Sequence, residues 1–143
     1  MAAYLDDALE TAALNETERR VVTRILARLS SKIGSDLLAV WLYGSRARGE
    51  ADPTETDPDL RSDIDLLAIV DSIRDLPELQ EWALPMVEEE GDAEGDSPVY
   101  YSLRVFDSDW LRDRRQIRSF FIQEVDRDKL ILAGGGLEGE EYR

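Results

Sequence analysis

The sequence predicts a domain of mixed α and β structure (α+β), in which helices pack on a small mixed β-sheet. Two apolar runs, 37–43 and 63–70, have the length and composition of strands that are covered on both faces. A third run, 99–106, is rich in the aromatic and β-branched residues that favour strands. Apolar side chains over 21–33 recur at helical spacing instead. The chain of 143 residues is long enough to bury one core.

The helix predicted over 15–33 has a clear start and stop. Asn15 and Glu18 have the spacing of a capping box, and Gly34 is a suitable residue to follow the last turn. The polar face of this helix carries four arginines: Arg19, Arg20, Arg24 and Arg28. They form either a stripe that faces a partner or a solvated face paired with acidic neighbours, and we expect the second.

A second helix is predicted from Pro77, a residue suited to the first helical turn, to about residue 90. Pro85 lies inside it and is expected to kink or break it. An acidic loop is expected over 91–98. Either Asp107 or Ser108 can then cap one helix whose apolar residues extend to Val125.

Three segments follow from this pattern. Residues 1–14 are weakly patterned and are predicted to be a loose arm or a short helix. The folded domain is expected to span residues 15–133 and to end in a short strand over 130–133. The glycine-rich residues 134–143 are predicted to be a flexible tail.

Two residue types are absent from the chain. Without cysteine there is no disulfide, thiolate metal site or cysteine nucleophile. Without histidine there is no Ser-His-Asp or Cys-His catalytic arrangement and no imidazole ligand. A metal site in this protein would therefore depend on oxygen ligands.

The charge and hydropathy of the chain narrow its partners. The formal net charge of −15 argues against direct binding of nucleic acid, which draws on clustered Lys and Arg. It suits a basic protein partner or simply a soluble surface. No apolar run approaches the length of a membrane span, and the N-terminus lacks the pattern of a signal peptide. We therefore expect no membrane partner and a cytoplasmic location. The sequence leaves open whether the protein forms a homo-oligomer.

The candidate site begins at the end of one predicted strand and resumes at the start of another. Gly44 and Ser45 follow the strand over 37–43, while Asp63 and Asp65 open the strand over 63–70. Because alternate side chains of a strand point to the same face, the two carboxylates project together. Two such carboxylates suit Mg²⁺, which is usually held by one or two carboxylates and by substrate phosphates.

The residues around Gly44 are suited to binding phosphate. A glycine turn lets the backbone approach a ligand closely, and a helix beginning after Ser45 would favour an anion. The Ser45 hydroxyl could donate to the same phosphate, and Arg46 or Arg48 could add charge-assisted contacts. Either motif alone is compatible with an ordinary turn or a solvated strand end, but their order along the chain favours a nucleotide site.

The segments Tyr43-Gly44-Ser45-Arg46-Ala47-Arg48-Gly49-Glu50 and Ser62-Asp63-Ile64-Asp65-Leu66 resemble the signature of polymerase-β-like nucleotidyltransferases. Within that superfamily the chain most resembles the minimal nucleotidyltransferases, the MNT or MntA-like antitoxins that are paired with HEPN toxins. The resemblance implies a nucleotidyltransferase-like fold, ATP as substrate and Mg²⁺ as cofactor. It also implies that Gly44 and Ser45 bind the β- and γ-phosphates and that Asp63 and Asp65 bind metal.

The chain departs from that signature in two places. The stretch between Ser45 and Asp63 is longer than usual, with the surplus in the polar residues 51–59, which a surface loop tolerates. The family's third carboxylate should lie on the strand over 99–106, which contains no Asp or Glu. Ser102 is predicted to occupy that position, and Asp107 could substitute only in another register.

Two functions therefore remain open. The protein is predicted to be an enzyme that transfers AMP from ATP to a hydroxyl on a HEPN-type toxin, and so acts as an antitoxin. The alternative is a catalytically weak or inactive module that neutralises such a toxin by binding it.

The chain contains a second cluster of arginines: Arg112, Arg114, Arg115 and Arg118. We expect these arginines to form internal salt bridges rather than to contact triphosphate or an acidic partner.

Overall fold

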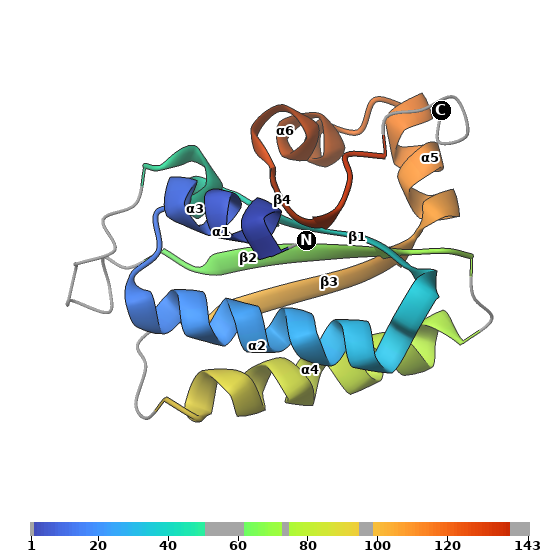
Figure 1. Cartoon of the computed structure of the whole chain (residues 1–143). Helices are drawn as coiled ribbons and strands as arrows, with labels where there is room; N and C mark the ends of the chain where they lie inside the picture. The colour runs from blue at the N-terminus through green and yellow to red at the C-terminus, as the bar shows by residue number, and fades with distance from the viewer. Residues whose placement is uncertain (1, 51–61, 73–74, 95–98, 138–143) are drawn as a thin grey trace.

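A four-stranded mixed sheet lies between two layers of helices (Figure 1). The computed structural model describes residues 2–50, 62–72, 75–94 and 99–137. The strands have the order β3-β2-β1-β4, and β1 pairs antiparallel with both β2 and β4, whereas β2 and β3 are parallel. Their bounds are Leu37–Tyr43 for β1, Ile64–Val70 for β2, Tyr101–Asp107 for β3 and Leu130–Gly134 for β4. The predicted fold class is confirmed.

Helices cover both faces of the sheet, which explains why the central strands β1 and β2 are almost continuously apolar. On one face Val40 and Leu66 join the cluster formed with α2 (Glu16–Ile33) and α4 (Leu76–Asp92). On the other, Trp41 and Leu67 pack with α5 (Ser108–Gln116) and α6 (Phe120–Asp128). None of the described helices is long and apolar enough to cross a bilayer.

Two structures were predicted for residues 1–14, a loose arm or a short helix, and the helix is the one that is present. This helix, α1 (Ala2–Thr11), lies against β4, and Leu9, Ala12 and Leu14 are buried in the core. The predicted capping box at Asn15 is also present, since the Asn15 Oδ1 atom accepts from the Glu18 N–H at 2.8 Å. The single-turn 3₁₀ helix η1 (Gly34–Asp36) then leads into β1.

Helix α4 is longer than predicted and continues through Pro85 to Asp92. Pro85 therefore does not end the helix. Its buried face, which includes Ala83 and Met86, packs in the core cluster and outweighs the local effect of the proline.

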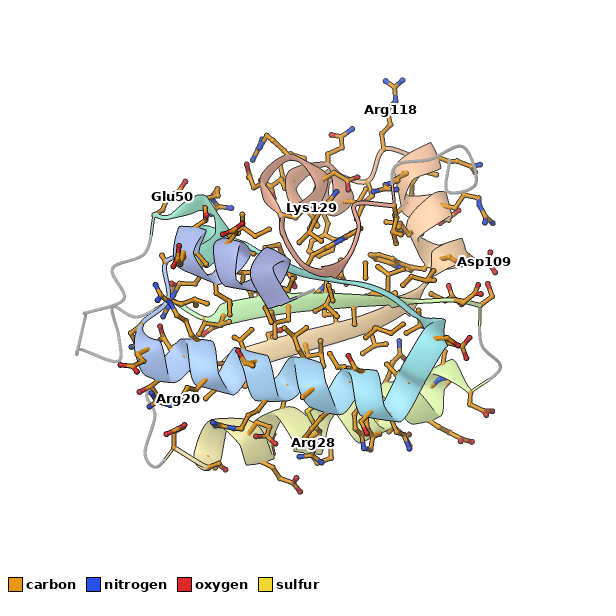
Figure 2. All side chains as sticks on the ribbon, in the orientation of Figure 1. Arg20, Arg28, Glu50, Asp109, Arg118 and Lys129 are labelled. Carbon is orange, nitrogen blue, oxygen red and sulfur yellow. The ribbon has the colours of Figure 1, made fainter. Side chains whose placement is uncertain are left out.

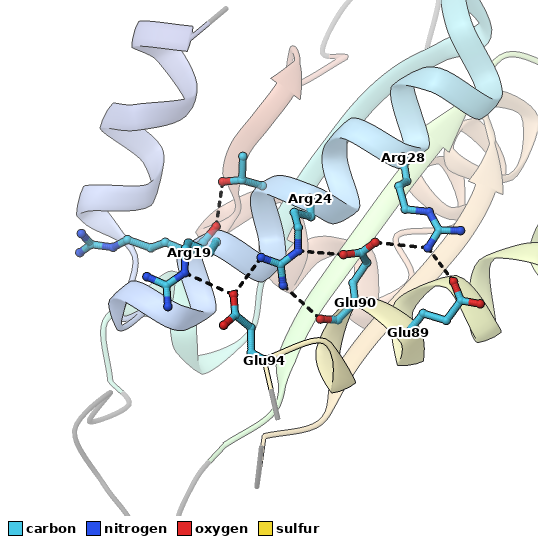
Figure 3. A network of polar contacts seen from close by, with 8 residues as sticks. Arg19, Arg24, Arg28, Glu89, Glu90 and Glu94 are labelled. Carbon is cyan, nitrogen blue, oxygen red and sulfur yellow. Dashed lines mark hydrogen bonds and ion pairs between the residues drawn. The ribbon is translucent and has the colours of Figure 1, made fainter. Parts of the chain in front are cut away.

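The arginines of α2 pair with glutamates of α4, as expected for a solvated, acid-paired face (Figure 3). Arg24 contacts Glu90 at 2.8 Å and Glu94 at 2.9 Å, and Arg28 contacts Glu89 at 2.8 Å. These contacts join the two helices along their outer sides.

The prediction of a single helix after residue 107 is wrong, because α5 and α6 are separate helices. Asp107 caps α5 by accepting from the Trp110 N–H at 2.9 Å. The chain then turns at Arg118, whose φ is 53°, and Ser119 caps α6. This turn lets both helices bury apolar side chains against the same face of the sheet.

The first residues of the predicted flexible tail are held to the sheet. The Trp41 Nε1–H donates to the Gly135 carbonyl at 2.8 Å, and Arg115 donates to the Gly136 carbonyl at 3.0 Å. Arg115 also binds Asp126, which accepts from Lys129 at 2.7 Å. Arg115 thereby joins α5, α6 and the chain after β4, while residues 138–143 lie outside the described part.

Replacing Asp126 by asparagine should destabilise the protein in a pH-dependent way. Burial alone would raise the pKa of Asp126, but hydrogen bonds from Arg115 and Lys129 outweigh it and hold the pKa below its usual value. The carboxylate therefore stabilises the fold above its unfolded-state pKa of about 4, and this contribution is lost as the pH falls through the lower folded-state value.

Asp126→Asn should lower the free energy of unfolding by about 1–2 kcal/mol at pH 7, with a shrinking difference below pH 4. Denaturant titrations at several pH values measure it, with Asp113→Asn as a surface control. A difference that does not change with pH would contradict this role.

Candidate functional site

The two predicted halves of the site meet at the junction of β1 and β2. Tyr43, the last residue of β1, pairs with Asp65 of β2, so the turn after Tyr43 lies beside the Asp65 side chain. Gly44 has φ +81°, and a Cβ atom there would lie 2.8 Å from the Asp65 Oδ2 atom. The backbone conformation, with φ +81° and ψ −162°, is one that only glycine adopts readily, whereas the Asp65 carboxylate could move away from a Cβ atom. The sequence prediction that Gly44 and Asp65 share a site is therefore consistent with their geometry.

A short helix, α3 (Ser45–Arg48), follows this glycine. The Gly44 carbonyl accepts from the N–H groups of Ala47 at 3.0 Å and Arg48 at 3.2 Å, which closes the turn. Gly49 ends α3 in the left-handed conformation. Ser45, the first residue of α3, is half-buried, and the predicted insertion over 51–59 lies outside the described residues.

Arg46 does not face a ligand, and its predicted role in phosphate binding is wrong. Its guanidinium is fully buried and forms an ion pair with Glu18, with nitrogen–oxygen distances of 2.7 and 3.1 Å. It also donates to the Ala13 carbonyl and to both the hydroxyl and the carbonyl of Ser62. These bonds use all five N–H donors of an arginine, so none is left for a phosphate.

The buried Arg46 instead fixes the position of the candidate site. Ser62 directly precedes Asp63, while Arg46 itself belongs to α3, so one side chain joins the two halves of the site. Glu18, the acidic partner of Arg46, links this arginine to the start of α2, where Glu18 also completes the capping box. The sequence showed the capping role of Glu18 but contained no signal of its second partner.

The two aspartates carry negative charge at the edge of the sheet. Asp63 is exposed just before β2, and Asp65 is half-buried at its second residue. Burial raises the pKa of Asp65, as does the charge of Asp63, while Arg104 acts in the opposite direction. Within the described residues neither carboxylate forms a hydrogen bond or an ion pair.

Ser102 lies next to Asp65, as predicted for the position of a third acid. The two residues are partners in the parallel register of β2 and β3. Asp107 pairs instead with Val70 at the other end of β2 and caps α5, which excludes it as a substitute. No cluster of three acidic residues suited to a metal occurs in the part of the chain that the structure describes.

The oxygen atoms at this edge fit a Mg²⁺ ion that is also bound by water or phosphate better than an ion held by protein ligands alone. Within the described residues Asp63 and Asp65 form no ion pair, and Ser102 lies on the neighbouring strand. Magnesium prefers oxygen ligands and commonly keeps waters or substrate phosphates beside one or two carboxylates. These oxygen donors therefore fit a Mg²⁺ ion that also binds a phosphate.

A hollow of about 150 Å³ lies beside the Gly44 turn. It is lined by Tyr43, Gly44, Arg48, Phe121, Glu124 and Val125. Pockets that enclose whole small molecules usually measure about 300–1,000 Å³, so this hollow could hold only part of a nucleotide. Arg48 contacts Glu50 at 3.0 Å and Asp128 at 3.9 Å, and it keeps its predicted place beside the Gly44 turn.

A larger hollow, of about 540 Å³, lies between α1 and α2 and is lined by none of the predicted site residues. It includes Arg19, Arg20 and Arg24 as well as Leu9. Size alone therefore does not mark the candidate site. We locate the site from the convergence of Gly44, Asp63 and Asp65.

Sequence reasoning missed the residues that surround the aspartates on this face of the sheet. Arg104 lies over the Phe121 ring at 5.2 Å, and the Phe121 ring meets that of Tyr43 edge-on at 5.4 Å. Burial, followed by the charge of Asp65, raises the pKa of Tyr43, while Arg104 lowers it. The alternation of polar and apolar residues in 101–106 was the signal that Arg104 shares a face with Ser102.

The second arginine cluster is mostly engaged in internal salt bridges, as expected. Arg112 pairs with Asp109 at 2.9 Å, and Arg114 pairs with Asp113 at 2.8 Å. Arg115 binds Asp126, whereas Arg118 projects from the corner between α5 and α6 (Figure 2).

Comparison with known proteins gives structural likenesses only. No protein-family model matches the sequence, and no curated protein is significantly similar to it. The chain is similar in structure to a "putative nucleotidyltransferase from Sulfolobus solfataricus", with 19% identity, 91% of this chain and 83% of that chain covered, and a TM-score of 0.44.

Two further likenesses are to toxin–antitoxin structures. One is named as a toxin–antitoxin with AMP-PNP, with 18% identity and a TM-score of 0.43. The other is a mutant of the toxin–antitoxin MntA-HpeT, with 17% identity and a TM-score of 0.44. Each covers 83% of this chain and 78% of the matched chain. We draw no conclusion from likenesses at this level, and the function proposed below rests on the residues of this chain.

Replacing Arg46 by methionine should destabilise the protein strongly, because it leaves the buried Glu18 carboxylate without its charged partner. The expected loss is about 3–5 kcal/mol of unfolding free energy, measured by denaturant titration. Adding Glu18→Gln should recover part of this loss, since glutamine removes the charge and can still serve in a capping box. Arg127→Met, on the surface, is the control. A loss below about 1 kcal/mol for Arg46→Met would contradict the role of the buried pair.

Replacing Gly44 by alanine should cost more stability than the same change at Gly49. Both glycines have positive φ, but Gly49, with φ +73° and ψ +17°, lies in the left-handed region that alanine can enter, whereas Gly44, with φ +81° and ψ −162°, lies in a region almost confined to glycine. Gly49→Ala should therefore cost about 1 kcal/mol, and Gly44→Ala at least about 2–3 kcal/mol. Thermal and denaturant unfolding measure both variants, and equal losses would show that the backbone at position 44 restricts side chains no more than the backbone at position 49.

Proposed function

We propose that this protein is a Mg²⁺-dependent nucleotidyltransferase that transfers AMP from ATP to a hydroxyl group. The observation that carries the proposal is the approach of the Asp65 carboxylate to Gly44, where a Cβ atom would lie 2.8 Å from Oδ2. It brings the phosphate-binding turn and the two candidate metal ligands to one edge of the sheet.

The reaction is a substitution at the α-phosphorus of ATP. The acceptor oxygen forms a new bond to this phosphorus, the bond to the bridging oxygen of the β-phosphate breaks, and pyrophosphate leaves. The hydroxyl proton passes to solvent or to a nearby base. A bound Mg²⁺ ion would neutralise phosphate charge during this transfer.

The residues at the sheet edge are suited to separate parts of this task. Asp63 and Asp65 would hold the metal, and the Gly44 backbone and the Ser45 hydroxyl would bind the β- and γ-phosphates. Arg48 would add a charged contact at the hollow beside Gly44. Arg46 takes no part in binding and keeps the turn and the aspartates in place through Ser62 and Glu18.

We propose a HEPN-type toxin as the acceptor, which would make the protein an antitoxin. This choice rests on the resemblance of the segments 43–50 and 62–66 to the minimal nucleotidyltransferases. A tyrosine hydroxyl of the toxin would be the group that receives AMP.

A second candidate function is a binding module without catalysis. It is favoured by Ser102, which lies beside Asp65 where a third carboxylate is expected. A hydroxyl is a far weaker base and metal ligand than a carboxylate. Loss of such a group can reduce a rate by about 10²–10⁴-fold, so the protein would then neutralise its toxin by stoichiometric binding.

Transfer of α-phosphate label from ATP to a cognate HEPN-type toxin, in the presence of Mg²⁺, tests the two candidates. The wild-type protein should transfer label, and the double variant Asp63→Asn with Asp65→Asn should lose it by at least about 100-fold. The double variant should still fold, because it removes two unpaired negative charges. Asp113→Asn is the control for loss of a remote carboxylate.

The two outcomes separate enzyme from binder. Neutralisation of the toxin that survives the double substitution, with no label transferred by the wild type, would support the binding module and exclude the enzyme. Neutralisation that disappears together with label transfer would support the enzyme.

A further inference from the structure

Arg104 lies on the same face of the sheet as the proposed metal ligands. In the parallel register of β2 and β3, Asp65 is opposite Ser102 and Leu67 is opposite Arg104. Because side chains alternate along a strand, Ser102 and Arg104 both project to the face that carries Asp65. Burial raises the pKa of both Asp65 and Tyr43, and the charge of Arg104 opposes that rise at each, so Arg104 lies within electrostatic reach of both side chains.

Aromatic side chains support this arginine. The Arg104 guanidinium lies 5.2 Å from the centre of the Phe121 ring, and Phe121 contacts Tyr43 edge-on. Behind Phe121, the rings of Phe106 and Trp110 stack at 4.0 Å with an interplanar angle of 9°. An arginine held over an aromatic face keeps its N–H donors in the plane of the guanidinium free for other partners.

Arg104 also differs from most arginines of this protein. Nine of the described arginines have a carboxylate oxygen within 4.0 Å: Arg20, Arg24, Arg28, Arg46, Arg48, Arg112, Arg114, Arg115 and Arg127. Arg104 has neither such a pair nor a hydrogen bond among the described residues. In a chain with 32 acidic residues against 17 basic ones, salt-bridge formation does not explain this position.

We propose that Arg104 is a phosphate-binding residue of the nucleotide site, an inference that rests on the function proposed above. Its unpaired guanidinium, its aromatic support and its position one alternate residue beyond Ser102 would direct charge-assisted bonds to phosphate oxygens of a nucleotide held at Asp63 and Asp65. The guanidinium has the fork of donors that matches phosphate geometry. Arg104 thus supplies positive charge on the strand that lacks a third carboxylate.

A phosphate-binding Arg104 should also change how strongly ATP binding depends on Mg²⁺. A third carboxylate would help to bind metal ions, whose charge neutralises phosphate. Arg104 would instead neutralise part of the phosphate charge directly. ATP binding by the wild-type protein should therefore weaken less at low Mg²⁺ than binding by a variant without this arginine.

Calorimetric titration with ATP and Mg²⁺ tests the proposal on the full chain. Arg104→Met should weaken ATP binding by about 10-fold or more, the loss expected for a charge-assisted contact, and should steepen its dependence on Mg²⁺. Arg104→Lys keeps the charge and should recover part of the affinity. Adenosine, which has no phosphate, should bind Arg104→Met and wild type equally if it binds at all.

Arg28→Met is the matched control, since it removes one arginine from the outer side of α2 on the opposite face of the sheet (Figure 2). It should leave ATP affinity unchanged, and thermal unfolding should show that both methionine variants are folded. If wild type binds ATP and Arg104→Met binds it as tightly as Arg28→Met does, the role of Arg104 is excluded while the nucleotide site stands. If wild type binds no ATP, both the site and the role of Arg104 are excluded.

Discussion

The buried ion pair of Glu18 and Arg46 is the interaction on which the candidate site depends. It joins the start of α2, the segment after α1, the turn helix α3 and the residue before Asp63. A buried charge pair is tolerable only when nearly every donor and acceptor is satisfied, and all five donors of Arg46 are used. This requirement fixes the turn relative to the strand far more narrowly than apolar packing would.

With that junction fixed, the site holds two carboxylates close together. Several carboxylates of the helix layers are paired with arginines, as between Arg24 and Glu90, although the chain has 32 acidic residues against 17 basic ones. Among the described residues Asp63 and Asp65 form no hydrogen bond or ion pair, and burial together with the charge of Asp63 raises the pKa of Asp65. Such an arrangement costs stability in the free protein, and a bound cation would remove that cost. The half-burial of Asp65 separates this edge from the ordinary acidic surface.

Sequence patterns predicted all four strands and the helix over 15–33. The bounds of all four strands agreed within two residues, and those of β1 and β2 were the clearest because both of their faces are buried, which gives long apolar runs. Prediction failed where local signals compete with packing: α4 continues through Pro85, and the chain turns at Arg118, a residue without the usual preference for left-handed backbone. The role of Arg46 was also wrong, because an arginine beside a glycine turn is equally compatible with a ligand and with a buried carboxylate.

The sequence by itself determined the fold class and excluded sulfur and imidazole ligands, and it predicted a shared site for Gly44-Ser45 and Asp63 with Asp65, since these follow from residue type and periodicity along the chain. Only the tertiary structure decided which arginine serves which purpose. Arg46 and Glu18 are 28 residues apart, and Arg104 meets Phe121 from another element, so neither contact leaves a local pattern. The register of β2 with β3 likewise depends on side-chain packing across the sheet, and it is what places Ser102 and Arg104 beside Asp65.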